Sequence, residues 1–336
     1  MDDNIHQDHY EICNQSISKY ISNKEKIDED KDVLVSCIVP THNRSDLLPR
    51  AIRSIQKQTY KNIEIIVVSD GSTDNTDSIM EDLCQQDERI RFIKYSPAQG
   101  GNFARNRGIQ EAQGDYIAFL DDDDEWLDTK LDKQIDLLKR NKNIGMSYTG
   151  VRIIYVDENM EYSFIGKADG DLSKEILFSN VIGTTSSVLI KKEILLKCGG
   201  FDNNLKAAQD HDLWIRICQV CKIGVVSEKL INYYNYSSSH QISTNAEKYV
   251  CAYKYIEDKY SDLYSKLTKR EMEKRNINML IGISNKYLRN GFGKKSREIL
   301  KSALKIKISI RILIYYLLSY FKFSTILKIR SFRGSN

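Results

Sequence analysis

Residues Asp115–Trp126 read DYIAFLDDDDEW, and this stretch decides the fold because it joins an apolar run to four consecutive aspartates. The run Tyr116–Leu120 has the length and composition of a strand that is buried on both faces of a sheet. Carboxylates packed this closely repel one another, and burying any of them is costly. The stretch therefore predicts a buried strand that delivers Asp121–Asp124 to a site where a cation, or a ligand that carries one, compensates their charge.

Strand-like and helix-like segments alternate on both sides of this stretch. Further strands are predicted at 33–39, 63–68, 90–95, 145–157 and 186–195, and helices at 47–59, from a cap at Ser72 or Thr73, 101–112, 129–141 and 209–220. This alternation predicts an α/β fold with a mainly parallel sheet covered by helices on both faces. Ligands of such sheets bind beyond the carboxyl ends of the strands. The loops PTHN (40–43), SDGS (69–72) and DDDD (121–124) are therefore expected to converge on one edge.

The composition divides the chain into three parts. Residues 1–32 are polar and form an expected N-terminal arm, and 33–245 form the expected α/β domain, with halves at 33–125 and 126–245. From residue 246 to 336, long helical segments rich in Lys, Tyr, Ile and Leu predict a helical extension.

The overall charge and the cysteines exclude several classes of protein. The net charge of +4, from 50 Lys and Arg against 46 Asp and Glu, does not indicate a nucleic-acid partner. The seven cysteines are odd in number and scattered, which favours reduced thiols in a cytosol, and Cys218 and Cys221 have no second pair to complete a zinc site. The N-terminus shows no signal peptide, and no apolar stretch is long enough to span a membrane.

Six segments in this order resemble glycosyltransferase family 2, a family of GT-A fold with a Rossmann-like sheet that binds a nucleotide sugar through a divalent cation. They are SCIVPTHNR (36–44), VVSDGSTD (67–74), ARNRGI (104–109), GDYIAFLDDDD (114–124), GGFD (199–202) and QDHDLWIRI (209–217). The resemblance covers Val33 to about Ser243. It implies transfer of a sugar to an acceptor hydroxyl, as in the synthesis of bacterial surface polysaccharides such as O-antigen or capsule.

The resemblance implies a nucleotide-sugar site made by the first loops. Its residues would be Pro40, Thr41, His42, Asn43, Asp70, Arg105, Asp121 and Asp122. The counterpart of Asp70 bonds the imide N–H of uracil, which favours UDP as the nucleotide. Structural interpretations remain open: Asn43 as a helix cap, Asp70 in an Asx turn, and Arg105 as an exposed helical arginine.

The resemblance also implies a metal site and a general base. Hard cations such as Mn²⁺ or Mg²⁺ prefer oxygen ligands, and Asp123 is the expected direct ligand, with His240 near the metal or the diphosphate. Asp210 matches the general base of the family, and Gln209 replaces a common glutamate beside it. One base without a protein nucleophile implies a single displacement with inversion at the anomeric carbon. A helix N-terminal acid favoured by the macrodipole is the alternative for Asp210, and a surface-loop histidine is the alternative for His240.

The C-terminal end carries a charge pattern of its own. From Lys301 onward there are eight Lys and Arg and no Asp or Glu, and ILIYYLLSYF (312–321) lies among them. This pattern predicts a cytoplasmic protein held peripherally at the inner face of the cytoplasmic membrane. Together with the family resemblance, it implies a lipid-linked saccharide as acceptor. Helices packed on the catalytic domain are the alternative.

Other functions compete with sugar transfer. A metal-dependent nucleotidyltransferase would also use aspartates and metal, but it gains nothing from Asp210. A non-catalytic scaffold that binds nucleotide sugars at the membrane would be favoured by a damaged base or metal motif, and both motifs are intact. No GxGxxG follows the first strand, which argues against a dinucleotide-dependent oxidoreductase.

Overall fold

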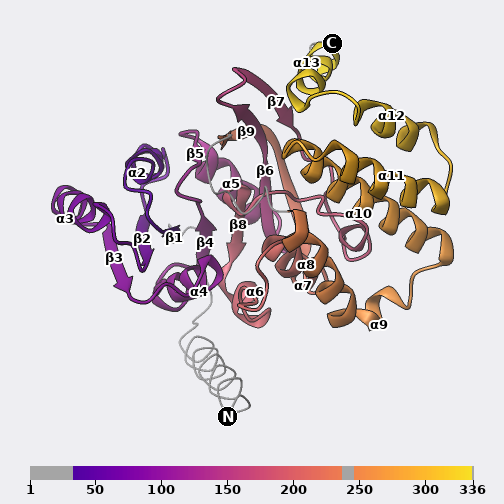
Figure 1. Cartoon of the computed structure of the whole chain (residues 1–336). Helices are drawn as coiled ribbons and strands as arrows, with labels where there is room; N and C mark the ends of the chain where they lie inside the picture. The colour runs from indigo at the N-terminus through magenta and orange to yellow at the C-terminus, as the bar shows by residue number, and fades with distance from the viewer. Residues whose placement is uncertain (1–32, 237–245, 335–336) are drawn as a thin grey trace.

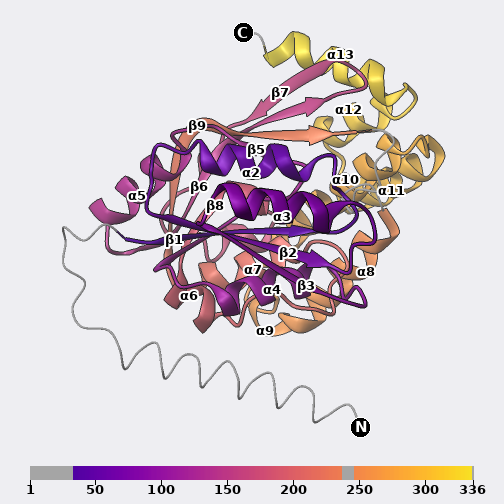
Figure 2. The same cartoon turned by 90° about the vertical axis from the view of Figure 1, so that its left-hand side faces the viewer.

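The computed structural model describes residues 33–236 and 246–334, with side chains described as far as residue 328. The predicted arm at 1–32 and His240 lie outside the described residues. Figures 1 and 2 show one curved sheet with helices on both faces and a group of C-terminal helices beside it. The predicted fold class is therefore confirmed.

The first half of the sheet is parallel. Its strands run in the order β3-β2-β1-β4. They are β1 (Val35–Thr41), β2 (Ile63–Asp70), β3 (Ile90–Tyr95) and β4 (Tyr116–Phe119). Every residue of β1, β2 and β4 is buried, because alternate side chains pack on the two helical layers. Since the strands share one direction, the loops that follow β1, β2 and β4 meet at one edge.

Two helical layers cover this half of the sheet (Figure 2). The helices packed against one face are α2 (Leu48–Gln56), α3 (Thr76–Gln86) and α5 (Lys130–Arg140). Those packed against the other are α4 (Gly101–Glu111), α6 (Lys192–Lys197) and α7 (Gln209–Cys218). The predicted cap of α3 at Ser72 or Thr73 was wrong. Asp74 accepts hydrogen bonds from Thr76 N and Oγ1, so a local turn delays the start of the helix.

The second half of the sheet mixes strand directions and continues the order as β8-β6-β9-β5. Its strands are β5 (Glu125–Trp126), β6 (Ile144–Tyr155), β7 (Met160–Phe164), β8 (Val188–Lys191) and β9 (Lys222–Asn235). β8 is antiparallel to both β4 and β6, so β6 and its parallel partner β9 point the same way as β4. Their carboxyl ends therefore lie on the same side of the sheet as the acidic loop.

The chain ends in six helices that gather at one side of the sheet (Figure 1). They are α8 (Ala246–Lys259), α9 (Ser261–Tyr264), α10 (Lys269–Arg289), α11 (Gly293–Ile306), α12 (Ile310–Leu318) and α13 (Phe323–Gly334). Ala252 and Ile256 of α8 pack into the same core as α4 and α7, and α13 lies beside β7. In the described part of the chain, no helix combines the length and apolar character needed to cross a bilayer.

Candidate active site

A cavity of about 600 Å³ opens at the edge where the parallel strands end, and this volume is within the usual range for ligand sites. It contains the sequence-predicted residues Pro40, Thr41, His42, Asp70, Arg105, Asp121, Asp122, Asp123 and Asp210. Asn43 is not among the lining residues. Its side chain instead accepts a hydrogen bond from Thr73 N, and its φ of 51° places it in the left-handed region. The predicted convergence of the three loops is confirmed.

One side of the cavity, the strand-end wall, consists of Thr41, Asp70, Asp121, Asp122 and Asp123, which end or follow β1, β2 and β4. Both oxygens of the Asp70 carboxylate accept backbone hydrogen bonds, from Gln99 N (2.6 Å) and Gly100 N (2.7 Å). These bonds tie the end of β2 to the start of α4. Asp70 uses its oxygens for these bonds, and not for the Asx turn that was its alternative role.

Each aspartate of the acidic loop has a different partner. Arg105 Nη2 donates to Asp121 Oδ1 at 2.6 Å, and Arg44 Nη1 donates to Asp123 Oδ2 at 2.6 Å. Thr41 Oγ1 donates to Asp122 Oδ2 at 2.8 Å. Asp124 is fully buried away from the cavity and accepts from Ser186 Oγ, so it holds the loop in place. Arg105 is thus an ion-pair partner of the acidic loop and not an exposed helical arginine.

The acidic loop is short of positive charge. Burial, reinforced by the neighbouring Asp123 carboxylate, raises the pKa of Asp122 to about 7, although Arg44 and the Thr41 hydrogen bond oppose the shift. A carboxylate in this position is stabilised in its charged form by additional positive charge. The loop therefore has the electrostatic character of a cation site.

A second group of lining residues, the helix wall, consists of Gln209 and Asp210 of α7, Tyr249 of α8 and Lys286 of α10. Asn180 Nδ2 donates to Asp210 Oδ2 at 2.9 Å, and His211 N donates to Asp210 Oδ1 at 2.8 Å. These two bonds fix the orientation of the carboxylate. The predicted base and the acidic loop therefore line one cavity.

The charges at the helix wall are buried. Burial raises the pKa of Asp210 above its ordinary value, while His211, Lys286 and Arg105 oppose the shift. Burial lowers the pKa of Lys286 to about 8, against the attraction of Asp210, and the Lys286 ammonium lies 3.5 Å from the centre of the Tyr249 ring. A carboxylate with a raised pKa is a stronger base, as a proton acceptor at neutral pH requires.

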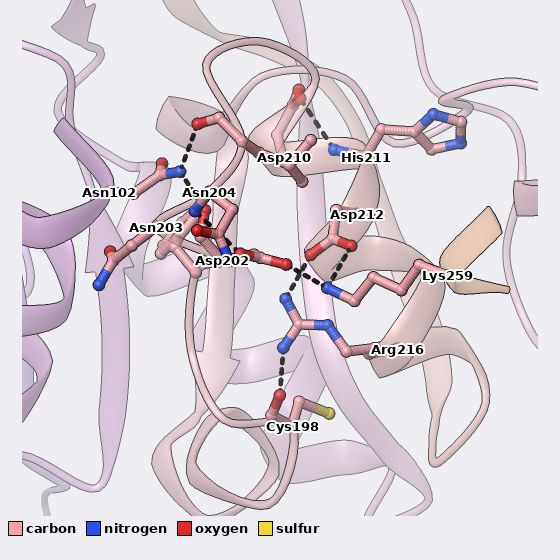
Figure 3. A network of polar contacts seen from close by, with 12 residues as sticks. Asn102, Cys198, Asp202, Asn203, Asn204, Asp210, His211, Asp212, Arg216 and Lys259 are labelled. Atoms are coloured by element: carbon pink, nitrogen blue, oxygen red, sulfur yellow. Dashed lines mark hydrogen bonds and ion pairs between the residues drawn. The ribbon is translucent and has the colours of Figure 1, made fainter. Parts of the chain in front are cut away.

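Asp212 lies two residues after Asp210 but has a structural role. Its fully buried carboxylate accepts from Arg216 Nη2 (2.6 Å), Lys259 Nζ (2.9 Å) and Tyr260 Oη (2.8 Å). Figure 3 shows this network on the side of α7 away from the bond between Asp210 and His211 N. Asp212 therefore joins α7 to the C-terminal helices. Of the two aspartates, Asp210 is the one that lines the cavity.

The turns around α7 have unusual backbone conformations. Gly199 and Gly200 have φ values of 77° and 69°, as expected for the GGFD turn. Ala208, directly before Gln209, also has a positive φ, of 53°, which a residue with a Cβ adopts only when its surroundings hold it there. The chain thus enters α7 through a strained residue, two positions before Asp210.

Several lining residues were not predicted from the sequence. They are Arg44, Gly100, Gly101, Ala104, Thr184, Thr185, Gln209, Tyr233, Tyr249 and Lys286. A signal existed for Thr184 and Thr185, because the polar run GTTSS directly precedes β8, and the start of an antiparallel strand lies at the edge where its parallel neighbours end. No comparable local signal marks Tyr249 or Lys286.

The fold and this cavity define a glycosyltransferase of the GT-A type. The sequence model of the family described as Glycosyl transferase family 2 matches residues 36–198. An uncharacterized glycosyltransferase of Rickettsia prowazekii is 35% identical over 249 residues, which is 71% of this chain and 74% of that protein. The chain belongs to glycosyltransferase family 2.

Two further relatives have more specific names. The GalNAc(5)-diNAcBac-PP-undecaprenol beta-1,3-glucosyltransferase of Campylobacter jejuni is 36% identical over 189 residues, covering 54% of this chain and 59% of that protein. A putative teichuronic acid biosynthesis glycosyltransferase of Bacillus subtilis is 31% identical over 185 residues, covering 55% of this chain and 71% of that protein.

Solved structures share the fold at low sequence identity. The mannosyltransferase of Pyrobaculum calidifontis in complex with GDP-Man and Mn²⁺ has a TM-score of 0.57 at 13% identity, covering 97% of this chain and 96% of that chain. TarS 1-349 of S. aureus in complex with UDP has a TM-score of 0.53 at 17% identity, covering 90% of this chain and 92% of that chain. These likenesses establish the GT-A fold.

Proposed function

We propose that this enzyme is an inverting glycosyltransferase that moves a sugar from a UDP-sugar to a hydroxyl group of a saccharide acceptor in the synthesis of a bacterial surface polysaccharide such as O-antigen or capsule. The observation that carries the proposal is that Asp123 and Asp210, which come from different elements, line one cavity. A sugar held between them would have its leaving diphosphate on one side and a base on the other. With one base, a single displacement inverts the anomeric carbon.

The strand-end wall would bind the nucleotide. A carboxylate has about four acceptor positions, so Asp70 can accept the imide N–H of uracil in addition to its two backbone bonds. Pro40, Thr41 and His42 would contact the base and ribose, with Asp121 and Asp122 nearby. His42 is held for this role because its Nδ1 contacts Asp70 O at 2.5 Å.

The acidic loop fits a divalent cation such as Mn²⁺ or Mg²⁺. In the described part of the chain no group of three or more His, Cys, Asp or Glu forms a complete metal site. Such cations often take only one or two protein carboxylates and complete their shell with substrate phosphates, which suits Asp123 as ligand beside Asp121 and Asp122. When bound, the cation would stabilise the negative charge of the departing diphosphate. The raised pKa of Asp122 supports this fit.

Asp210 would accept the proton of the attacking hydroxyl. Asn180 and the peptide N–H of His211 hold its two oxygens, so the carboxylate is oriented before the substrate arrives. The positive charges of Lys286 and Arg105 favour the ionised form of Asp210 against the effect of its burial. Asp210 lines the cavity and Asp212 does not, so Asp210 is the residue suited to this role.

The test is a panel of sugar nucleotides screened by thermal unfolding with and without Mn²⁺. A ligand at 100 times its Kd stabilises the native state by about 2.7 kcal/mol. We expect UDP-sugars to stabilise the protein in a Mn²⁺-dependent way, Asp123→Asn to lose this effect, and Asp128→Asn, an exposed acid outside the cavity, to keep it.

The products of the reaction separate the competing functions. Sugar transfer releases UDP from the donor, whereas a nucleotidyltransferase would release pyrophosphate from a nucleoside triphosphate. A non-catalytic scaffold would show Mn²⁺-dependent stabilisation but no turnover with any saccharide acceptor. Stabilisation by no sugar nucleotide would contradict the proposal as a whole.

We also infer that the acceptor is lipid-linked and that the C-terminal helices contact the inner face of the cytoplasmic membrane. Ile308 and Ile310, at the start of α12, are 78% and 74% exposed, and Leu317, Tyr320 and Phe321 are exposed as well. The basic residues around this apolar surface are Lys305, Lys307, Arg311 and Lys322. Each basic group near an anionic leaflet contributes about 1 kcal/mol, so an anionic bilayer is the matching partner. The lipid-linked name of the Campylobacter relative supports the same acceptor class.

Vesicle sedimentation tests this contact with the full chain. We expect binding to vesicles that contain phosphatidylglycerol and weaker binding to pure phosphatidylcholine. Ile308→Ser with Ile310→Ser should reduce the binding, whereas Ile165→Ser, an exposed isoleucine remote in sequence from α12, should not. Equal recovery of all proteins in the supernatant would contradict the membrane contact without affecting the catalytic proposal.

A further inference from the structure

A second cavity, of about 350 Å³, lies at the carboxyl ends of β6 and β9. Its lining comes from the ends of these strands, the turn between β6 and β7, the end of α10 and the start of α13, where Figure 1 shows α13 beside β7. The lining residues are Tyr155, Glu158, Asn235, Tyr236, Arg289, Asn290 and Phe323. None of them lines the candidate active site.

The two cavities are neighbours along two shared elements. On β9, Tyr233 lines the active-site cavity, and Asn235, which lies on the same face two residues later, lines the second cavity. On α10, Lys286 and Arg289 are one turn apart and line the first and second cavity respectively. A ligand that extends from the active site along β9 and α10 therefore enters the second cavity.

Arg50 connects the acidic loop to the second cavity directly. Its guanidinium donates to the backbone oxygen of Asp123 at 2.6 Å and to the hydroxyl of Tyr236 at 3.1 Å. It also lies 4.0 Å from the centre of the Tyr234 ring, which stacks on Tyr236. The wall of the second cavity is thus fixed to the loop that would hold the diphosphate.

The polar groups of this cavity call for a ligand with hydroxyl groups. Asn235 is 3% exposed, and within the described residues its Oδ1 has no hydrogen-bond partner. That oxygen is itself buried beneath the surface of the cavity, so the polar groups that a ligand meets include the Glu158 carboxylate and the Arg289 guanidinium. A phosphate dianion would be repelled by Glu158. Hydroxyl groups both donate and accept, which suits the mixture of Asn235, Glu158 and Arg289.

The apolar part of the cavity suits a sugar ring. Tyr155 and Phe323 lie with ring centres 5.8 Å apart at an interplanar angle of 56°, and the Tyr155 hydroxyl is bonded to that of Tyr162 at 2.9 Å, which holds the ring. Tyr155 is buried with Tyr162 stacked on its ring, whereas Phe323 is half-buried, so the C–H face of a pyranose would pack on Phe323 while its hydroxyls reach the surrounding polar groups. The volume is at the small end of ligand sites, which fits a single sugar unit.

We propose that the second cavity is an acceptor subsite that binds a neutral sugar unit of the acceptor, next to the unit that carries the attacking hydroxyl. This inference rests on the proposed function, because it assumes that the acceptor is a saccharide. The cavity would select acceptors by the identity of this inner sugar.

The experiment uses the full chain with UDP and Mn²⁺ and titrates methyl glycosides of glucose, galactose, N-acetylglucosamine and mannose, followed by saturation-transfer NMR. We expect at least one glycoside to bind with millimolar affinity. Glu158→Gln and Phe323→Ala, both at half-buried positions of the lining, should each weaken it about fivefold or more. Glu161→Gln is the matched control, because it makes the same change at an exposed position of β7 that does not line the cavity.

Three results would overturn the subsite. They are binding of no glycoside, equal binding by all variants, and displacement of the glycoside by inorganic phosphate at lower concentration than by a second glycoside. Thermal stabilisation by UDP in the same samples separates this failure from that of the proposed function. Stabilisation without glycoside binding contradicts only the subsite, whereas absence of both contradicts sugar transfer itself.

Discussion

The two walls of the active-site cavity are built in different ways. The strand-end wall takes its five residues from the last positions of two parallel strands and from the loop after a third, so the backbone register of the sheet alone brings them together. The helix wall takes its residues from three helices, and two of these, α8 and α10, belong to the C-terminal extension. In the proposed reaction, the donor side would therefore depend on the sheet, and the acceptor side would depend on how the helices pack.

The sharpest test of this comparison is Asp210→Asn. A positioned base contributes roughly 10² to 10⁴ in rate, so we expect kcat to fall by that factor while UDP binding stays near that of the native protein. Stability should fall by about the value of one hydrogen bond, because the amide keeps a single acceptor oxygen for the two donors, Asn180 Nδ2 and His211 N. Calorimetry with UDP and a transfer assay measure the two quantities. Parallel loss of binding and turnover would show that the helix wall also holds the donor.

Asp212→Asn should give the opposite pattern. Breaking a buried ion pair costs about 3 to 5 kcal/mol, and the lower end applies here because Arg216 and Lys259 reach solvent with side chains 20% and 27% exposed. Urea unfolding should therefore show a loss of about 3 kcal/mol. At a temperature where the variant is folded, kcat should lie far closer to native than that of Asp210→Asn. A fully stable Asp212→Asn would contradict the structural role of this network.

Lys286→Met is expected to have the smallest effect, visible mainly in the pH profile of kcat. Asp210 works as a base when ionised, so activity rises with pH through its raised pKa, and the Lys286 ammonium, which is present below about pH 8, favours the ionised form. The groups facing Lys286 include Asp210, Arg289 and Tyr249. Without the ammonium, the acid limb should move to higher pH because Asp210 loses a favourable charge.

Lys286→Arg is the conservative control for this profile. Since a guanidinium remains charged across the accessible range, the acid limb should stay in place. An unchanged profile in both variants would mean that Lys286 only packs against Tyr249.

The sequence predicted the strand-end wall because each of its residues follows a buried strand. Pro40, Asp70 and Asp121 stand where apolar runs stop, and the rule for parallel sheets places such positions at one edge. Asp210 was assigned through family resemblance, and Asn180, which orients it, was not predicted. Asn180 and Asp210 are 30 residues apart in the chain, and local sequence patterns do not indicate contacts between residues this far apart.

The strand β9 was also absent from the prediction, although it is the longest strand described. Its middle reads VVSEKL, where charged residues interrupt the apolar pattern of a buried strand. The structure shows shifts of register against β6 at this point, around Gly150, so the strand bends where its sequence becomes polar. The domain boundary predicted near residue 245 stays a prediction. Tyr249 and Lys286, which follow it in the sequence, line the active-site cavity.

Because β9 is one continuous strand, it sets the spacing between the two cavities. Tyr233 and Asn235 mark the two cavities along one extended backbone, and two residues of a strand span about 7 Å. That length is comparable to one repeat of a glycan chain and cannot stretch, because covalent geometry sets it. An acceptor one sugar unit too short would leave the second cavity empty. The spacing along the strand would therefore select acceptors by their length as well as position them.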